Sequence, residues 1–273
     1  VGTSLALSRP RFSGAERLDL PTIPNICDFT KMDMEYRQRS LALPADDGLY
    51  HFSNEHDACG VGMLANLSGV ATHDIVSRGV TILKRLLHRG AAGRDPLSGD
   101  GAGLLSVIPH GFFQRCVGGI LPAPGAYAVG VLFNGVGGES TLERVLSEEG
   151  LRVLAWRDVP SDLSSIGEVA RGSCPVIRQV FVASKEGLAG EALERRVFVA
   201  RRRLEKELLD VYFPSFSTRT IVYKGLMLAT QIKSFYGDLA DEQFVSPLVL
   251  VHQRYSTNTF PTWRLAHPFR YLA

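Results

Sequence analysis

The 273-residue sequence lacks a strong charge of either sign, because 30 basic and 28 acidic side chains leave a net charge of only +2. A balanced charge gives no electrostatic footprint for nucleic acid or for an anionic membrane, so we expect neither partner. Long apolar runs are also missing, since none approaches the about 18–20 residues that a membrane span needs. The first forty residues mix arginines with acidic residues and hold no apolar run, so we expect neither a transit peptide nor a secretory signal within them.

Cysteine is scarce and scattered, at Cys27, Cys59, Cys116 and Cys174, with no C-x-x-C pair. A disulfide framework is therefore not expected in a chain of this size, and a reducing compartment is the default. His56 and Cys59 form an H-x-x-C pair, but a structural zinc site needs about four ligands and no second pair stands at a suitable spacing. The sequence thus predicts no metal site.

The chain begins at Val1 rather than methionine and ends at Ala273 without a closing signal, so we expect a piece of a longer protein. Residues 1–58 contain four prolines, little periodicity and a polar run near their end, which predicts a loosely ordered leader. From Cys59 onward the pattern is that of a globular domain, which we expect to span residues 59–273.

Apolar side chains at helical spacing predict a helix over His73–His88, with Thr72 as its N-cap and Gly90 at its end. A second predicted helix, Glu191–Asp210, has a basic face that we interpret as solvated, with phosphate binding as the alternative. Strands outnumber helices and alternate with them irregularly, which favours stacked sheets with helices over a regular βαβ series. The predicted strands are Val61–Leu67, Leu104–Ile108, Tyr127–Phe133, Leu151–Trp156, Val176–Ala183, Thr218–Tyr223 and Pro247–His252.

Cys59 stands at the start of the first predicted strand, directly after the polar leader and before Gly60. Most cysteines in such a context are small core residues. However, Gly60 allows close approach of another chain segment or a substrate, and glycine-rich turns between residues 90 and 103 and the charged strand end at Arg254 are expected to converge nearby. The residues alone leave a core and a catalytic role open.

Two further motifs follow the predicted elements. The stretch SGDGAG, residues 98–103, contains G-x-G-x-G, but a strand follows it where a dinucleotide loop needs a helix, so we predict a tight turn. Arg254 ends a predicted strand, where its guanidinium can hold a carboxylate in a bidentate fork or make a surface ion pair. The small polar residues after it, followed by Phe260, Pro261 and Trp263, suit a loop with an aromatic lid over a polar ligand, or a plain surface loop.

Four stretches together carry a resemblance: CGVG from Cys59, LHRGAAGRDPLSGDGAG from Leu87, VYKGLM from Val222 and HQRYSTNTFPTWRLAHPFRYLA from His252. The chain resembles the class II glutamine amidotransferase domains of glutamate synthase large subunits, and TNTFPTW favours these over other members of the class. The resemblance implies an α+β fold of the N-terminal-nucleophile (Ntn) hydrolases, a four-layer αββα sandwich, here truncated at its C-terminus. The chain has Ala91-Ala92-Gly93-Arg94 where the family usually has a second, non-nucleophilic cysteine.

The resemblance also implies the site. Residues 1–58 would be a propeptide that is cleaved between Ala58 and Cys59, leaving Cys59 as N-terminal nucleophile. Glutamine would be held by Arg254 through its α-carboxylate and by the loop after it, with Tyr255, Ser256 and Thr257 as further binding residues. A thiol has a pKa of about 8.5 and an α-amino group one of about 7.7–8.0, so the amine of an N-terminal cysteine can take the thiol proton and return it to ammonia. The Asn-Gly pair of the oxyanion hole is expected just beyond Ala273.

The implied reaction is hydrolysis of L-glutamine to glutamate and ammonia, which a separate synthase site adds to 2-oxoglutarate. No cofactor is expected in this chain, whereas FMN and an iron–sulfur cluster are implied for the whole enzyme, with an electron-transferring subunit or ferredoxin as partner. We expect a cytoplasmic protein, or a plastid one in a eukaryote. Two alternatives remain open: another class II amidotransferase, and a non-catalytic scaffold domain that keeps the Ntn fold.

Overall fold

The computed structural model describes residues 59–256 and 259–269, which form two four-stranded antiparallel sheets and flanking helices. The first sheet has the order β1-β8-β2-β7, with β1 (Gly60–Ala65), β8 (Leu248–Gln253), β2 (Ala102–Val107) and β7 (Thr220–Gly225). The second has the order β4-β5-β3-β6, with β4 (Leu151–Asp158), β5 (Ile177–Ser184), β3 (Ala128–Phe133) and β6 (Tyr212–Ser217). The helices are α2 (His73–Arg85), α3 (His110–Cys116), α4 (Glu139–Glu148), α5 (Glu168–Gly172), α6 (Gly190–Glu207) and α7 (Ile232–Phe235).

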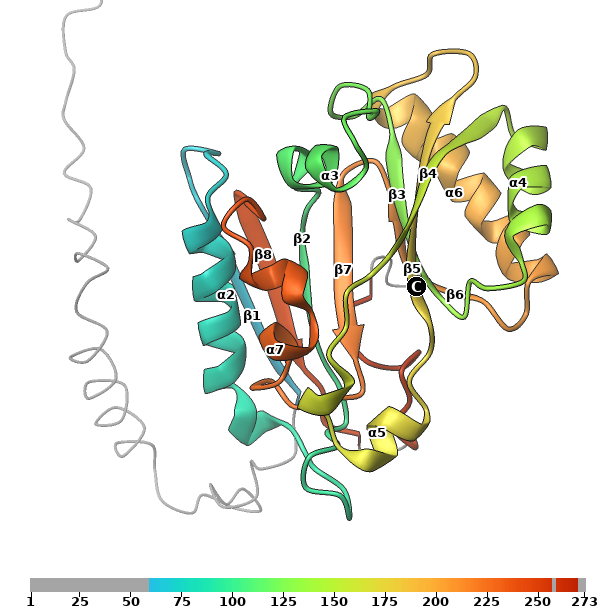
Figure 1. Ribbon diagram of the computed structural model, residues 1–273. Coiled ribbons are helices and arrows are strands. Elements are labelled where there is room, and N and C mark those ends of the chain that lie inside the picture. Colours follow the sequence, from blue (N-terminus) through green and yellow to red (C-terminus); the bar gives the residue numbers. More distant parts are fainter. Residues whose placement is uncertain (1–58, 257–258, 270–273) are drawn as a thin grey trace, which may run out of the picture. The chain divides into compact units, whose positions relative to one another are not determined.

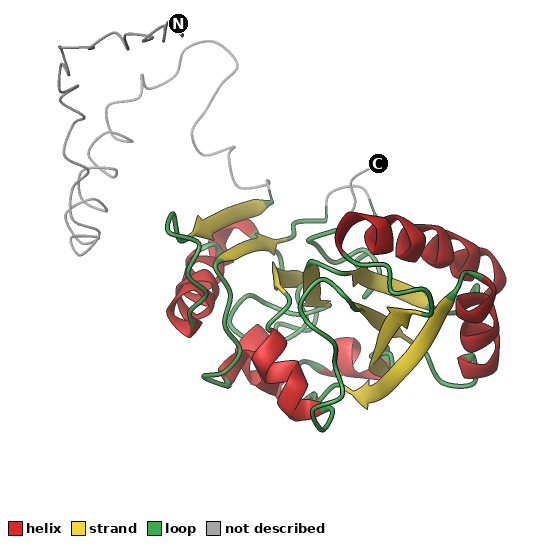
Figure 2. Cartoon of the chain, turned by 90° about the horizontal axis from the view of Figure 1, so that it is seen from above, coloured by secondary structure: helices red, strands yellow, loops and turns green. Residues whose placement is uncertain are grey.

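The elements stack as four layers. Helix α2 covers the first sheet, the second sheet packs on the opposite side of the first, and α4 and α6 cover the outer face of the second sheet (Figures 1 and 2). One apolar cluster joins α2 and both sheets, and another joins the second sheet to α4 and α6. This arrangement confirms the predicted αββα sandwich.

Helix α2 is capped at its N-terminus and packs closely on the strands beneath it. The Thr72 hydroxyl caps its N-terminus by accepting a hydrogen bond from the Ile75 backbone N–H at 3.4 Å, as predicted. A Cβ added to Gly79 would lie 2.5 Å from Val249 Cγ2 of β8, and one added to Gly62 of β1 would lie 2.5 Å from Ile82 Cγ2 of the helix. Both glycines are therefore required by the close helix–sheet contact.

The seven predicted strands all form, with ends that shift by at most two residues. The predicted helix His73–His88 is divided, because the α-helix ends at Arg85 and a 3₁₀ turn, η2 (Leu87–Arg89), follows before Gly90. Strand β6 and the helices α3, α4, α5 and α7 were not predicted from the sequence. Strand β6 contains Pro214 and two serines, and these helices are too short for a clear periodicity.

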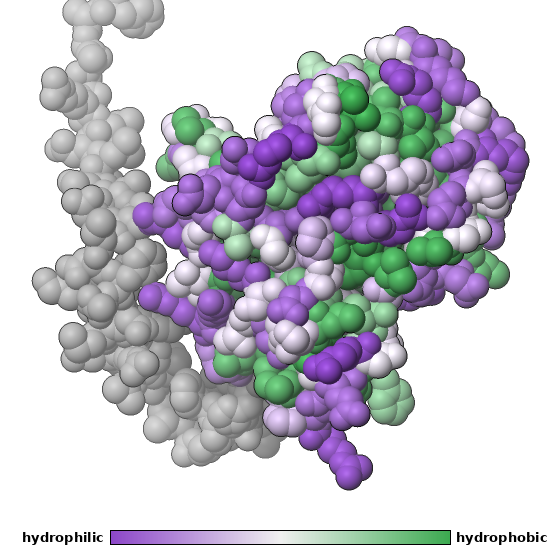
Figure 3. Space-filling view, viewed as in Figure 1, coloured by the Kyte–Doolittle hydropathy of each residue, from purple (hydrophilic) through white to green (hydrophobic). Residues whose placement is uncertain are grey.

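The basic face of α6 is paired with carboxylates. Arg195 pairs with Glu191 at 2.7 Å, and Arg201 pairs with Glu205 at 2.8 Å. Arg203 contacts Glu149 of the segment after α4, and hydrophilic residues dominate this α4 edge of the surface in Figure 3. Arg195 and Arg202 are exposed, as the interpretation of a solvated face expects, whereas Arg201 is largely buried.

No helix in the described part of the chain is long and apolar enough to cross a bilayer. The predicted leader, residues 1–58, lies outside the described residues, so its assignment stays a prediction.

Candidate active site

Cys59 lies immediately before β1, beside the point where the neighbouring strand β8 ends. Its half-buried Sγ accepts a hydrogen bond from the Tyr255 backbone N–H at 3.3 Å and lies 3.6 Å from the Tyr255 carbonyl oxygen. The neighbouring Gly60 is packed under the segment after α2, because a Cβ there would lie 3.0 Å from the Cβ atoms of Leu86 and Arg89. The close approach that Gly60 permits is thus made by this segment of the chain.

Arg254 directly follows β8 and is 6% exposed. Its backbone N–H donates to the Gly101 carbonyl at 2.8 Å, which ties the strand end to the glycine-rich turn. Its guanidinium donates to Thr259 Oγ1 at 2.6 Å and to the Asp100 carbonyl at 3.4 Å. Within the described residues these bonds use two of the five guanidinium N–H donors, and the remaining donors suit a carboxylate.

The SGDGAG stretch is a turn that enters β2 at Ala102, as predicted, and it belongs to the site. Gly101 has φ +135° and its position has no room for a side chain, because a Cβ would lie 2.9 Å from Ala266 Cβ. The Asp100 carboxylate accepts a hydrogen bond from the Ser256 backbone N–H at 2.5 Å. This contact of Asp100 with the loop after Arg254 was not foreseen from the sequence.

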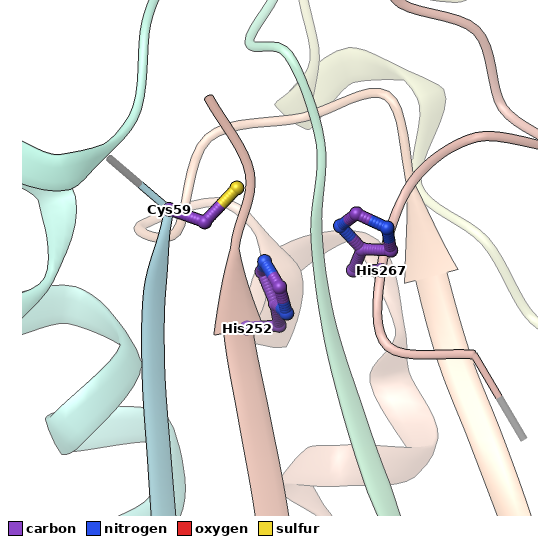
Figure 4. Close-up of side chains that lie close together, drawn as sticks. All are labelled: Cys59, His252 and His267. Atoms are coloured by element: carbon purple, nitrogen blue, oxygen red, sulfur yellow. The ribbon is translucent and has the colours of Figure 1, made fainter. Parts of the chain in front are cut away.

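Two histidines that sequence reasoning did not single out lie beside Cys59. His252 is on β8, two residues before Arg254, and His267 reaches the same place from the irregular C-terminal segment (Figure 4). The ring centroids are 4.3 Å apart, and one ring nitrogen of each and Cys59 Sγ all lie within 4.8 Å of one another. His252 shares a motif with Arg254, which could have signalled its position, whereas no local pattern marks His267.

Both imidazoles are held neutral. Burial, the other histidine and the Arg254 charge lower the pKa of His252 to about 4. Burial, Arg254 and Lys224 lower the pKa of His267 to about 4 in the same way. Among the described residues, His252 Nε2 and His267 Nδ1 are buried without a hydrogen-bond partner.

Lys224 of β7 is completely buried and fixes the segment that carries His267. Its Nζ lies 2.9 Å from the Arg264 carbonyl, 2.7 Å from the Ala266 carbonyl and 2.8 Å from Tyr212 Oη. Burial, with smaller effects of Arg201 and Arg254, lowers the pKa of Lys224 to about 6. The Nζ donates to both carbonyls and to the phenol oxygen, and these bonds tie the C-terminal segment to β7 and β6.

The two aromatic rings of the predicted lid differ in exposure. Phe260 is 92% exposed, but Trp263 is 4% exposed, packs edge-on against Phe133 and donates from Nε1 to the Ala170 carbonyl at 3.1 Å. Trp263 therefore anchors the loop in the core. Its large apolar surface, which made it a lid candidate in the sequence, is what buries it.

Of the predicted site residues, the structure brings together Cys59, Arg254, Tyr255 and Ser256. Thr257 and Ala58 lie outside the described residues. Their predicted roles stay predictions.

The comparisons with known proteins agree with the motifs. A sequence profile described as "Glutamine amidotransferases class-II" matches residues 59–273. The "Glutamate synthase [NADPH] large chain" of Bacillus subtilis (strain 168) is 47% identical over 251 residues, covering 88% of this chain and 16% of that protein. The protein of the same name from Azospirillum brasilense is 39% identical over 254 residues, covering 88% of this chain and 17% of the relative.

A third relative is "Ferredoxin-dependent glutamate synthase 1, chloroplastic/mitochondrial" of Arabidopsis thaliana, 37% identical over 252 residues and covering 85% of this chain. The chain spans only 15–17% of the length of these three relatives. The profile, in contrast, matches the whole of the predicted folded domain. The chain belongs to the class II glutamine amidotransferases.

Proposed function

We propose that this domain is the glutaminase part of a glutamate synthase, in which Cys59 releases ammonia from L-glutamine. The proposal rests on one observation above all: the Cys59 thiol lies against the backbone of Tyr255, the residue directly after the buried Arg254. The same strand end thus carries a nucleophile's partner and a carboxylate-binding side chain, which are the two groups that a glutamine site requires.

In the proposed reaction, removal of residues 1–58 exposes the α-amine of Cys59. The amine takes the thiol proton, and the thiolate attacks the side-chain amide carbon of glutamine. The C–N bond breaks, the amine returns the proton to the departing ammonia, and a glutamyl thioester remains. Water then hydrolyses the thioester to glutamate. Arg254 binds the α-carboxylate, and Asp100 fixes the backbone at Ser256, so that the loop holds its place beside the substrate.

The ammonia would pass to 2-oxoglutarate at a synthase site in other domains of the same longer chain. We expect FMN and an iron–sulfur cluster there, and an electron-transferring subunit or ferredoxin as partner. The described residues do not fit such a cluster, which needs several cysteine thiolates together, because Cys59, Cys116 and Cys174 stand on separate elements. A cytoplasmic or plastid location is part of the same proposal.

The first test is the intact mass of the full-length protein purified from its native host. A mature chain that starts at Cys59 would support the N-terminal nucleophile. A chain that retains residues 1–58 would leave Cys59 without an amine and favour the scaffold alternative.

The second test compares glutaminase activity in Cys59→Ser and in the control Cys116→Ser, which changes an exposed cysteine on α3. We expect loss of activity only in Cys59→Ser, with an unchanged circular dichroism spectrum. Equal activity in both variants would rule out the proposed nucleophile. If glutamine is hydrolysed but 2-oxoglutarate is not aminated, another class II amidotransferase becomes the better interpretation.

A further inference from the structure

The two neutral histidines beside Cys59 have no part in the proposed glutaminase reaction, yet they form the one potential metal-binding cluster of His, Cys and acidic residues found within the described residues. We propose that Cys59, His252 and His267 bind a zinc ion, and that the bound ion blocks the nucleophile. The inhibitory effect rests on the proposed role of Cys59, whereas zinc binding itself does not.

The ligand set fits zinc by chemical type. Thiolate sulfur and imidazole nitrogen are the ligands that Zn²⁺ prefers, and one sulfur with two nitrogens matches the three protein ligands of an open zinc site. The proposed bonds form from Zn²⁺ to Cys59 Sγ and to one nitrogen of each ring, and the thiol proton leaves to solvent.

The distances are close to those required. Zinc bonds of about 2.0–2.3 Å in a tetrahedron place the ligand atoms about 3.3–3.7 Å apart. The three ligand atoms here lie within 4.8 Å of one another, so the side chains need to move inward by about 1 Å. Such a shift is small for Cys59, which precedes its strand, and for His267, which is on an irregular segment (Figure 4).

The surroundings favour reversible binding. His252 Nε2 and His267 Nδ1 lack hydrogen-bond partners among the described residues, so coordination through these atoms would break no protein hydrogen bond. The nearby Arg254 charge repels a dication, which favours a dissociable inhibitor over a permanent structural ion.

Removal of the leader would strengthen the site. In the uncleaved chain the Cys59 nitrogen is an amide, which is a poor ligand. After cleavage the α-amine and the thiolate of the same residue can chelate one ion, and with both histidines they complete four ligands. Zinc would then bind the mature chain more tightly than the precursor, and it would occupy the amine that serves as the proposed base.

The experiment measures alkylation of individual cysteines in the full-length protein by iodoacetamide, with and without zinc sulfate, by peptide mass spectrometry. Cys116 is exposed in the same chain and serves as internal control. We expect zinc to slow labelling of Cys59 by about tenfold or more, to leave Cys116 unchanged, and to lose its effect when EDTA is added. Equal protection of both cysteines, or of neither, would overturn the proposal.

Histidine variants test the ligands. His267→Asn and His252→Gln are each expected to raise the zinc concentration for half-protection of Cys59 by about tenfold or more. The control His110→Asn removes a half-buried histidine on α3, whose ring contacts the Tyr127 hydroxyl, and should leave the protection unchanged. Protection that persists in both ligand variants would refute the site, and two variants guard against one that fails to fold.

Zinc inhibition of glutaminase gives the functional readout, with each variant compared to its own zinc-free rate. If glutaminase activity falls over the same zinc concentrations that slow the alkylation of Cys59, the result supports a blocked nucleophile. Protection without inhibition would overturn the inhibitory effect and leave the metal site standing. A protein that shows protection but no glutaminase activity at all would contradict the proposed function alone.

Discussion

Replacement of Lys224 by methionine tests how the C-terminal segment is held in the site. The lysine side chain is fully buried, and its amine bridges the carbonyls of Arg264 and Ala266 to Tyr212 Oη. Methionine fills nearly the same volume as the aliphatic stem but provides no donor. Lys224→Met therefore removes the bridge while it keeps most of the packing.

The size of the effect follows from the two carbonyls. A buried acceptor that loses its donor costs about 1–3 kcal/mol. The contact to Ala266 is buried and should incur this cost in full, whereas the contact to Arg264 is only partly buried, so water compensates there. We expect a loss of about 2–4 kcal/mol in the free energy of opening of the segment around His267.

Hydrogen–deuterium exchange of the full-length protein measures this local free energy. Amides in peptides that cover residues 263–269 should exchange about 30–800-fold faster in Lys224→Met, since each 1.4 kcal/mol is a factor of about ten. The control Lys206→Met changes an exposed lysine on α6 and should leave these peptides unchanged. Unchanged exchange in Lys224→Met would show that the bridge does not hold the segment, and the reasoning would be refuted.

Four further predictions concern pH, substrate and packing. Because the folded-state pKa of Lys224 is lowered to about 6, the unfolded chain binds more protons than the folded chain between about pH 6 and 10.4, and folding becomes more favourable as the pH rises. The protection factors of residues 263–269 against hydrogen exchange should therefore rise from pH 7 to 9 in the wild type but not in Lys224→Met. The histidine pKa values of about 4 likewise mean that the unfolded chain binds more protons than the folded one between about pH 4 and 6.5, so the fold loses stability as the pH falls through this range. Thermal melting should detect this loss, and it should be smaller in His267→Asn. Arg254→Lys should raise KM for glutamine by about 10–100-fold in steady-state kinetics, since lysine cannot form the bidentate fork; an unchanged KM would contradict that role. Gly79→Ala should cost about 1–3 kcal/mol, seen as faster exchange of α2, because its Cβ would lie 2.5 Å from Val249 Cγ2.

Much of the fold could be predicted because its signals are local. The apolar stripe of α2 and its cap at Thr72 specify that helix before any tertiary contact is known, and short β-branched runs mark the buried strands. Strand β6 could not be recognised, since Pro214 usually argues against a strand interior. Its position at the edge of the second sheet, next to β3 alone, is what tolerates the proline, and this position is known only once the sheet order is known.

The site illustrates the same limit more strongly. The central position of β8 between β1 and β2 gives Gln253 two antiparallel partners, Gly60 on one side and Ala102 on the other. Because antiparallel neighbours run in opposite directions, the end of β8 must meet the starts of both β1 and β2. Strand β7 also pairs with β2 in the antiparallel direction, with Gly225 opposite Ala102. The end of β7 therefore lies beside the start of β2 as well.

Four motifs that are far apart in the sequence thus converge at one end of the strands of the first sheet. They are the stretch after Cys59, the turn before β2, the Lys224 end of β7 and the residues that follow β8. The motifs could be read from the sequence, but their order in the sheet could not. A shift of β8 by one residue would turn both His252 and Arg254 to the other face of the sheet. The surroundings of Cys59 therefore depend on the register of β8, which the alternating burial of Val249, Val251 and Gln253 fixes.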